Sequence, residues 1–193
     1  VITGAEVTAV KGFVGRFEAL LSTGETIDAG ALIIATGAQS YVPKDGEFGA
    51  GSRTVITLPD FTAWLVTLTG SEKTLRYNGR DIRSVAFVHC VGSRQVEGRH
   101  PPGEDGRIND YCSRICCTSA LHAAQEVQRR FSDIQVFDVY RDIRTYGRGH
   151  ESIYETVSKN GALFFRQNED EDPVINGRSE EHTSELQSLT DIS

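Results

Sequence analysis

Apolar and polar residues alternate along the first part of the chain, which is the pattern of strands with one buried face. Residues 6–10 and 15–21 follow this period of two, and a polar turn is expected at 22–25. Residues 31–35, Ala-Leu-Ile-Ile-Ala, form a nearly continuous apolar run, which is typical of a strand buried on both faces. This run ends at Gly37, so we predict a strand-rich region over the first part of the chain.

The rest of the chain alternates helices with strands. A Gly- and Pro-rich loop leads to a helix expected over 61–68, and a polar linker follows. Beyond the linker, strands are predicted at 85–90, 134–140 and 162–165, and helices at about 113–131 and 150–159. Strands that alternate with helices predict a β-α-β-α-β unit with a parallel sheet and right-handed crossovers. Ligands of such sheets bind at the C-terminal ends of the strands, where loops enter the helices.

Composition narrows the class of protein. The 193 residues carry a net charge of −7 and are 38% hydrophobic, as in globular domains. The acidic balance argues against a nucleic-acid-binding module, whose signature is a basic stripe. No apolar stretch approaches the roughly 20 residues of a membrane helix, and no signal peptide is visible. Because the chain has no Met, we expect it to be an interior piece of a longer, cytoplasmic protein.

The last sixteen residues, 178–193, differ from the rest. The letters RSEEHTSELQS at 178–188 match the conceptual translation of a common sequencing-adapter oligonucleotide. The segment is polar and has neither a helical nor a strand period. We therefore expect a non-native tail and exclude it from reasoning about the fold; a natural disordered tail is the competing interpretation.

All four cysteines flank one predicted strand-to-helix connection. Cys90 ends the strand at 85–90, and Cys112, Cys116 and Cys117 lie at the start of the next helix. Cys112 and Cys116 are four residues apart and would share a helical face. Cys90 approaches from the strand end across a long loop, so four sulfurs can close a cage without bending a regular element.

The spacing leaves four interpretations open. A [4Fe–4S] cluster takes four thiolates, and a helix N-terminus with Arg94 and Arg114 nearby suits its negative charge. Zinc is possible, although structural zinc sites usually pair two separated C-x2-4-C knuckles. The remaining two interpretations are redox-active thiols and plain buried cysteines. His89, on an apolar strand, is expected to be a core residue, and His100, His122 and His150 are expected at the surface.

Longer motifs make the sequence specific. They are ATG at 35–37, YVP at 41–43, EFGAG at 47–51, VIT at 55–57, CVGSR at 90–94, YCSRICC at 111–117 and YRDIRTYGRG at 140–149, with Glu151 and Tyr154 beyond. Together they resemble the A subunit of heterodisulfide reductase and its bacterial relatives, over essentially all of residues 1–177. The resemblance departs in one place, because the stretch between Cys90 and Cys112 is longer than in typical members.

The resemblance implies a thioredoxin-reductase-like flavin module. It implies an α/β fold, in which a strand-rich part of a FAD-binding domain precedes the Rossmann-like parallel sheet. Residues 1–50 would be the partial FAD-binding domain, 51–83 a connecting helix and linker, 84–177 the Rossmann-like domain, and 178–193 the tail. The cofactors implied are FAD, contacted by Ala35, Thr36 and Gly37, and a [4Fe–4S] cluster ligated by Cys90, Cys112, Cys116 and Cys117.

The implied function is electron transfer between FAD and iron–sulfur centres in an oxidoreductase subunit. The loop after residue 90 has one nearby glycine, Gly92, where nucleotide-binding relatives carry G-x-G-x-x-G, so the cluster is expected to replace a nicotinamide site. Expected partners are other heterodisulfide-reductase-type subunits, ferredoxin, and hydrogenase or formate dehydrogenase modules. The isolated piece is expected to be inactive, and no catalytic residue is assigned. The rival functions are a pyridine-nucleotide disulfide oxidoreductase using redox thiols and a zinc or thiol sensor domain.

Overall fold

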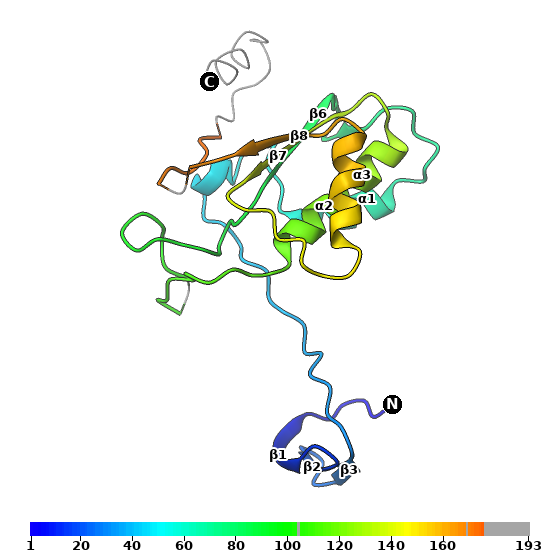
Figure 1. The fold of residues 1–193 in the computed structure, drawn as a ribbon, viewed down its shortest axis with the longest axis vertical. Helices are drawn as coiled ribbons and strands as arrows, with labels where there is room; N and C mark the ends of the chain where they lie inside the picture. Colours follow the sequence, from blue (N-terminus) through cyan, green and yellow to red (C-terminus); the bar gives the residue numbers. More distant parts are fainter. Residues whose placement is uncertain (104, 169, 176–193) are drawn as a thin grey trace. The chain divides into compact units, whose positions relative to one another are not determined.

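The computed structural model describes residues 1–103, 105–168 and 170–175, and the expected tail at 178–193 lies outside them. The chain divides into two compact units, one of residues 1–39 and one that begins at Ser40 (Figure 1). In the described part, no helix is both long and apolar enough to cross a membrane.

The first unit is a small antiparallel sheet. Its strands are β1 (Val7–Phe13), β2 (Arg16–Leu21) and β3 (Thr26–Ala29), hydrogen-bonded in the order β1-β2-β3. Ala19 and Leu21 on β2 are buried, whereas every residue of β1 is exposed. The period-two pattern therefore predicted these first two strands within three residues at their ends, but the buried face it implies is present on β2 and absent on β1.

The strand predicted at 31–35 is not formed. This segment has no regular secondary structure, and Ile33 and Ile34 are 88% and 79% exposed. Among the described residues no strand pairs with it, so its backbone groups have no ladder partners and its apolar side chains have no sheet face to pack against. The prediction was wrong because an apolar run records a preference for burial, which only neighbouring strands can satisfy.

The second unit is built around a parallel sheet of three strands. Its order is β6-β7-β8, with a helix in each crossover, so the predicted α/β class and the β-α-β-α-β order are confirmed. In Figure 1 the helices gather on one side of this sheet. The elements are η1 (Glu47–Gly49), α1 (Leu58–Thr67), β4 (Arg76–Tyr77), β5 (Arg80–Asp81), β6 (Ser84–Val88), α2 (Cys116–Arg130), β7 (Gln135–Tyr140), α3 (His150–Lys159) and β8 (Leu163–Arg166).

Helix ends in this unit follow local chemistry. Thr57 caps α1 by accepting a hydrogen bond from the Asp60 backbone N–H at 3.3 Å, and Pro59 sits in the first turn, so the helix begins three residues earlier than predicted. Helix α3 has the predicted bounds, 150–159. Helix α2 has no side-chain cap at its first turn, and this end carries Cys116 and Cys117, which are described below.

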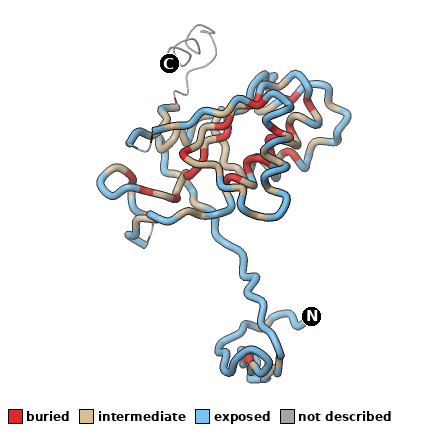
Figure 2. Tube along the Cα trace, in the orientation of Figure 1, coloured by how far each residue is buried: buried red, intermediate tan, exposed pale blue. Residues whose placement is uncertain are grey.

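The core of the second unit lies between the sheet and the helices. The predicted apolar face of α2 is buried, with Ala124 and Val127 fully inaccessible. This face packs in one cluster with Val136 of β7 and Val157 of α3, and buried positions concentrate there in Figure 2. The core therefore fixes α2 against the sheet and holds the start of α2 near the C-terminal ends of the strands.

Candidate metal centre

The C-terminal end of β6 carries two buried site residues, His89 and Cys90. The His89 backbone N–H bonds the Val139 carbonyl at 3.0 Å, so the parallel pairing with β7 continues one residue past β6. Cys90 then has a φ of 64°, in the left-handed region that non-glycine residues rarely adopt. Arg94 and Arg114 also have positive φ. Such conformations persist where surrounding structure enforces them, and they concentrate at functional sites.

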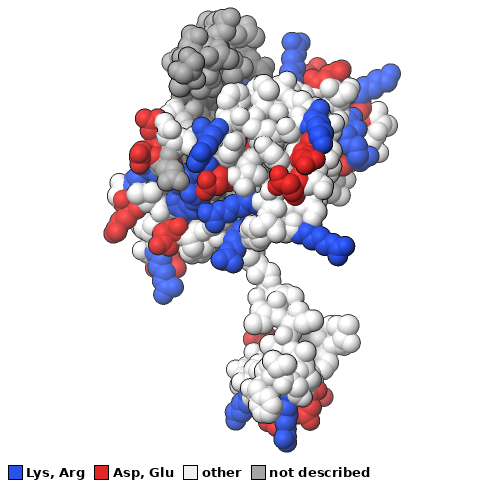
Figure 3. Space-filling view, viewed as in Figure 1, with Lys and Arg blue, Asp and Glu red and all other residues white. Residues whose placement is uncertain are grey.

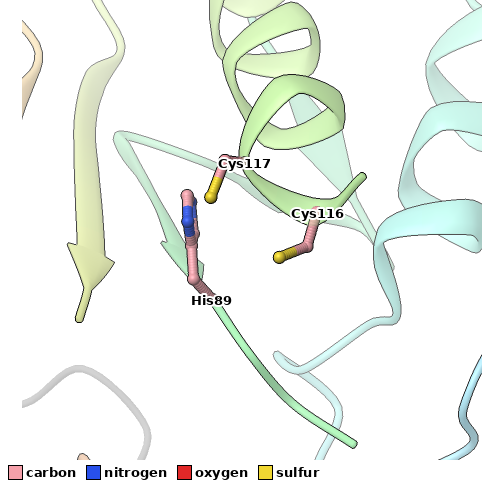
Figure 4. A group of neighbouring side chains, drawn as sticks. All are labelled: His89, Cys116 and Cys117. Atoms are coloured by element: carbon pink, nitrogen blue, oxygen red, sulfur yellow. The ribbon is translucent and has the colours of Figure 1, made fainter. Parts of the chain in front are cut away.

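The start of α2 supplies Cys116 and Cys117. Their sulfurs and one ring nitrogen of His89 all lie within 4.8 Å of one another. In the described part of the chain this is the one such set of three or more His, Cys, Asp or Glu ligand atoms. Figure 4 shows both cysteine side chains directed from the helix toward the His89 ring. A strand end and an uncapped helix start therefore converge, as the topology predicted.

Cys90 joins the two helical cysteines through a hydrogen-bonded group of sulfurs. Hydrogen bonds with Cys117 and Cys90 lower the pKa of Cys116. The hydrogen bond to Cys116, followed by burial, raises the pKa of Cys90 and that of Cys117. Hydrogen bonding within the group therefore favours the thiolate form of Cys116. The Cys117 thiol also donates to the Asp142 backbone carbonyl at 3.6 Å. A bound metal would take the place of the thiol protons, because thiolates are the binding form.

Cys112 lies apart from this set. It is half-buried in the irregular segment before α2, and its sulfur accepts a hydrogen bond from the Arg114 backbone N–H at 3.3 Å. It does not belong to the set formed by His89, Cys116 and Cys117. Two of the four predicted ligands therefore lie in this set, and Cys90 is hydrogen-bonded to Cys116 beside it. Ligation by the four cysteines stays a prediction.

A buried His–Asp pair backs the cysteines. The Nε2 atom of His89 lies 3.0 Å from Oδ2 of Asp138, and the two side chains are 1% exposed. The burial of His89 was predicted, but its place beside the sulfurs was missed. The signal was available in the sequence, since His89 and Asp138 interrupt two apolar strands whose C-terminal ends share one edge of a parallel sheet.

The connection over residues 91–111, which we call the long loop, folds back onto the unit. The Arg94 and Gln95 backbone N–H groups bond the carbonyls of Tyr111 and Asn109, both at 2.9 Å. Asp172 anchors the loop, with His100 Nε2 at 3.0 Å, and also binds the buried Arg141 at 2.9 Å. His100 is only 8% exposed, so its predicted place at the surface was wrong: its ring is held between Asp172 and the Val96 backbone N–H, which donates to Nδ1 at 2.8 Å.

Positive charge lies close to the sulfurs but is largely balanced. Arg94 and Arg141 act electrostatically on Cys90 and favour its thiolate, against the larger effects of the hydrogen bond and burial. Arg94 also binds Asp142 at 2.8 Å. On the visible face of this unit, basic side chains alternate with acidic ones (Figure 3). The site is therefore suited to offset a modest negative charge and presents no extended basic surface in that view.

These residues fit a thiolate-bound metal centre. The donors are sulfurs, a buried ring nitrogen of His89 (Nδ1) has no hydrogen-bond partner, and the first-turn N–H groups of α2 have no side-chain cap. A single tetrahedral zinc ion places its ligand atoms about 3.8 Å apart, whereas a cubane binds one thiolate at each iron and holds the sulfurs further apart. The compact set of His89, Cys116 and Cys117, within 4.8 Å, is also suited to a single ion. Residues 35–37, by contrast, lie in a segment without regular secondary structure, and FAD contact there stays a prediction.

Comparison with known proteins finds relatives that are all A subunits of heterodisulfide reductases. No protein-family model matches the chain. The chain is 33% identical over 145 residues to the iron–sulfur A subunit (copy 1) of the CoB–CoM heterodisulfide reductase of Methanopyrus kandleri. It is 33% identical to the A subunit of the H2:CoB–CoM heterodisulfide,ferredoxin reductase of Methanothermobacter marburgensis. It is 35% identical to the A subunit of the ferredoxin/F420H2-dependent CoB–CoM heterodisulfide reductase of Methanosarcina acetivorans. Each match covers 72% of this chain but only 21%, 21% and 17% of these relatives.

Proposed function

Because the chain belongs to the family of heterodisulfide reductase A subunits, we propose that it holds a [4Fe–4S] cluster within an electron-transferring oxidoreductase. Its ligands are Cys90, Cys112, Cys116 and Cys117. The observation that carries the proposal is the convergence of Cys116 and Cys117 with His89, where the end of β6 meets the start of α2, with Cys90 hydrogen-bonded to Cys116. The Methanopyrus relative is named as an iron–sulfur protein, which agrees with sulfur ligation.

The chain's own residues give the centre its setting. Cys90 follows β6 with a left-handed backbone and is hydrogen-bonded to Cys116, and Cys112 would supply the fourth sulfur from the segment before α2. The first-turn N–H groups of α2, with Arg94 and Arg141, offset the negative charge of four thiolates. When bound, a [4Fe–4S] cluster supplies one-electron transfer between a donor and an acceptor.

Electron exchange with FAD completes the proposal. The strand end at β6 leads into the long loop, which lacks the glycine-rich phosphate loop of nucleotide-binding relatives. We infer that electrons pass between FAD, contacted by residues 35–37, and iron–sulfur centres. The relatives are named for ferredoxin, hydrogen, F420H2 and formate. Suitable partners are therefore other heterodisulfide-reductase-type subunits, ferredoxin, and hydrogenase or formate dehydrogenase modules.

Anaerobic metal analysis tests the proposal. The chain should bind about four irons and four acid-labile sulfides and absorb broadly near ~400 nm. Cys116→Ser, at the centre of the sulfur group, should lose most of the iron, whereas Ser119→Ala, an exposed position on the same helix, should keep it.

The rival functions give different results in the same analysis. One zinc per chain and no iron would favour a zinc or thiol sensor, which the compact His89, Cys116 and Cys117 set also suits. Metal-free chain would favour redox thiols. In the longer protein, rapid flavin reduction by NADH that Cys112→Ala leaves unchanged would contradict the cluster route.

A further inference from the structure

His89 has one satisfied ring nitrogen and one unsatisfied one. Its Nε2 lies 3.0 Å from the Asp138 carboxylate, whereas Nδ1 is buried without a hydrogen-bond partner. The whole residue is only 2% exposed, so bulk water does not satisfy Nδ1. Oδ1 of Asp138 is also buried and unpartnered. The pair is thus an incompletely satisfied polar unit inside an apolar sheet.

A purely structural role does not account for this pair. An unsatisfied buried polar group costs about 1–3 kcal/mol, and an apolar residue at position 89 would avoid that cost. The ring lies within 4.8 Å of the sulfurs of Cys116 and Cys117, and no other described His, Asp or Glu shares that set. In Figure 4 these two sulfurs flank the space beside the ring. One ring nitrogen of His89 therefore lies near both sulfurs, and Nδ1 is the ring nitrogen that has no partner.

We propose that His89, held by Asp138, donates a hydrogen bond from its ring to a sulfur of the metal centre and thereby raises the reduction potential of that centre. This inference rests on the proposed function. Thiolate and sulfide sulfurs only accept hydrogen bonds, so the ring must present an N–H to them. The contact of Nε2 with the Asp138 carboxylate fixes the ring, so that the other nitrogen is the one left to face a sulfur.

The direction of the effect follows from electrostatics. An N–H that points at the sulfurs places positive charge where the added electron is delocalised, so the reduced state is stabilised more than the oxidised state. Hydrogen bonds to the sulfurs are among the factors that set cluster potentials. The four cysteines already provide one sulfur for each iron, so His89 acts as a positioning and tuning residue and not as a ligand.

Three variants of the full chain test this after anaerobic loading with iron and sulfide. The double variant His89→Phe/Asp138→Asn removes the donor without leaving an unpaired carboxylate. His89→Gln keeps an amide N–H at the same place. His122→Gln, at an exposed position on α2, is the matched control. Iron and sulfide content, midpoint potential at fixed pH, and nitrogen and deuterium couplings in pulsed electron paramagnetic resonance are measured for each.

The double variant should shift the ratio of reduced to oxidised centre about tenfold toward oxidised at a given applied potential. For a one-electron couple this is a midpoint potential about 59 mV lower. His89→Gln should recover part of this shift, and His122→Gln should match the unmodified chain. The unmodified chain should show a weak nitrogen coupling and an exchangeable deuteron, both lost in the double variant.

Two results would overturn the inference while leaving the proposed function intact. One is a full cluster in every variant with the same midpoint potential. The other is a strong nitrogen coupling typical of direct ligation, which would make His89 a ligand instead of a donor. A chain that binds no iron and sulfide at all would overturn the proposed function, and this inference with it. If the double variant does not fold, His89→Gln takes its place. A His89→Gln chain with no deuteron coupling and an unchanged midpoint potential would also overturn the inference.

Discussion

Gly92 offers a sharp test of how the cysteine turn is packed. Its φ is +73°, and a Cβ built on it would overlap the ring of Tyr41. Gly98, in the same long loop, has a φ of +81° but meets nothing within 4 Å. Gly98→Ala therefore bears only the conformational cost, roughly 1–2 kcal/mol. Gly92→Ala bears that cost plus overpacking of about 1–3 kcal/mol, for a total of roughly 2–5 kcal/mol.

Urea unfolding followed by tryptophan fluorescence measures this difference. The chain has one tryptophan, Trp64, and its ring packs 5.0 Å from that of Tyr77 in the second unit. The signal therefore reports unfolding of the unit that carries Gly92. Removing the whole Tyr41 side chain in the double variant Tyr41→Gly/Gly92→Ala should recover the overpacking part, because the Tyr41 Cβ also lies only 2.3 Å from the added Cβ. Equal unfolding free energies for Gly92→Ala and Gly98→Ala would refute the packing of Tyr41 on this turn.

Three further predictions concern the core, the long loop and one phenol. Leu121→Ala, at a fully buried site, should lower the free energy of unfolding by about 2–5 kcal/mol in urea, against little change for Leu163→Ala at a site 47% exposed. Asp172→Asn should destabilise the second unit by up to about 3 kcal/mol and speed proteolysis of the long loop; Asp105→Asn, whose ion pair is exposed, should leave both unchanged. Burial and its hydrogen bond to Glu47 raise the pKa of Tyr41 to about 12, so the absorbance difference between the unmodified chain and Tyr41→Phe should titrate near that value. Because the folded pKa lies above the ordinary 10, any stability that depends on the neutral phenol should be intact below pH 10 and decline from 10 to 12; a midpoint near 10 would contradict this environment.

The parallel sheet could be predicted because its sequence signals are local and agree with one another. The apolar face of α2, with Ala124 and Val127, and the runs of β6 and β7 each carry their own period, and the alternation of strands and helices restricts the topology. The same topology predicts that Cys90, at a strand end, lies close to Cys116, at the start of the next helix. The strand predicted at 31–35 was wrong for the opposite reason: its burial depends on neighbouring strands, and the described part of the chain provides none that pair with it.

The finer parts of the site depend on long-range pairing, which no local pattern encodes. The contact of His89 with Asp138 spans 49 residues and follows from strand register. The burial of His100 depends on Asp172, far along the chain and beyond β8. The left-handed backbone of Cys90 had no sequence signal either, since glycine is the residue expected in that conformation.

X-ray absorption at the iron edge of the anaerobically purified chain tests the central claim most directly. A cubane held by four thiolates predicts an all-sulfur first shell and a clear iron–iron scattering path. A chain without iron, or one whose metal is zinc with mixed nitrogen and sulfur neighbours, would contradict it.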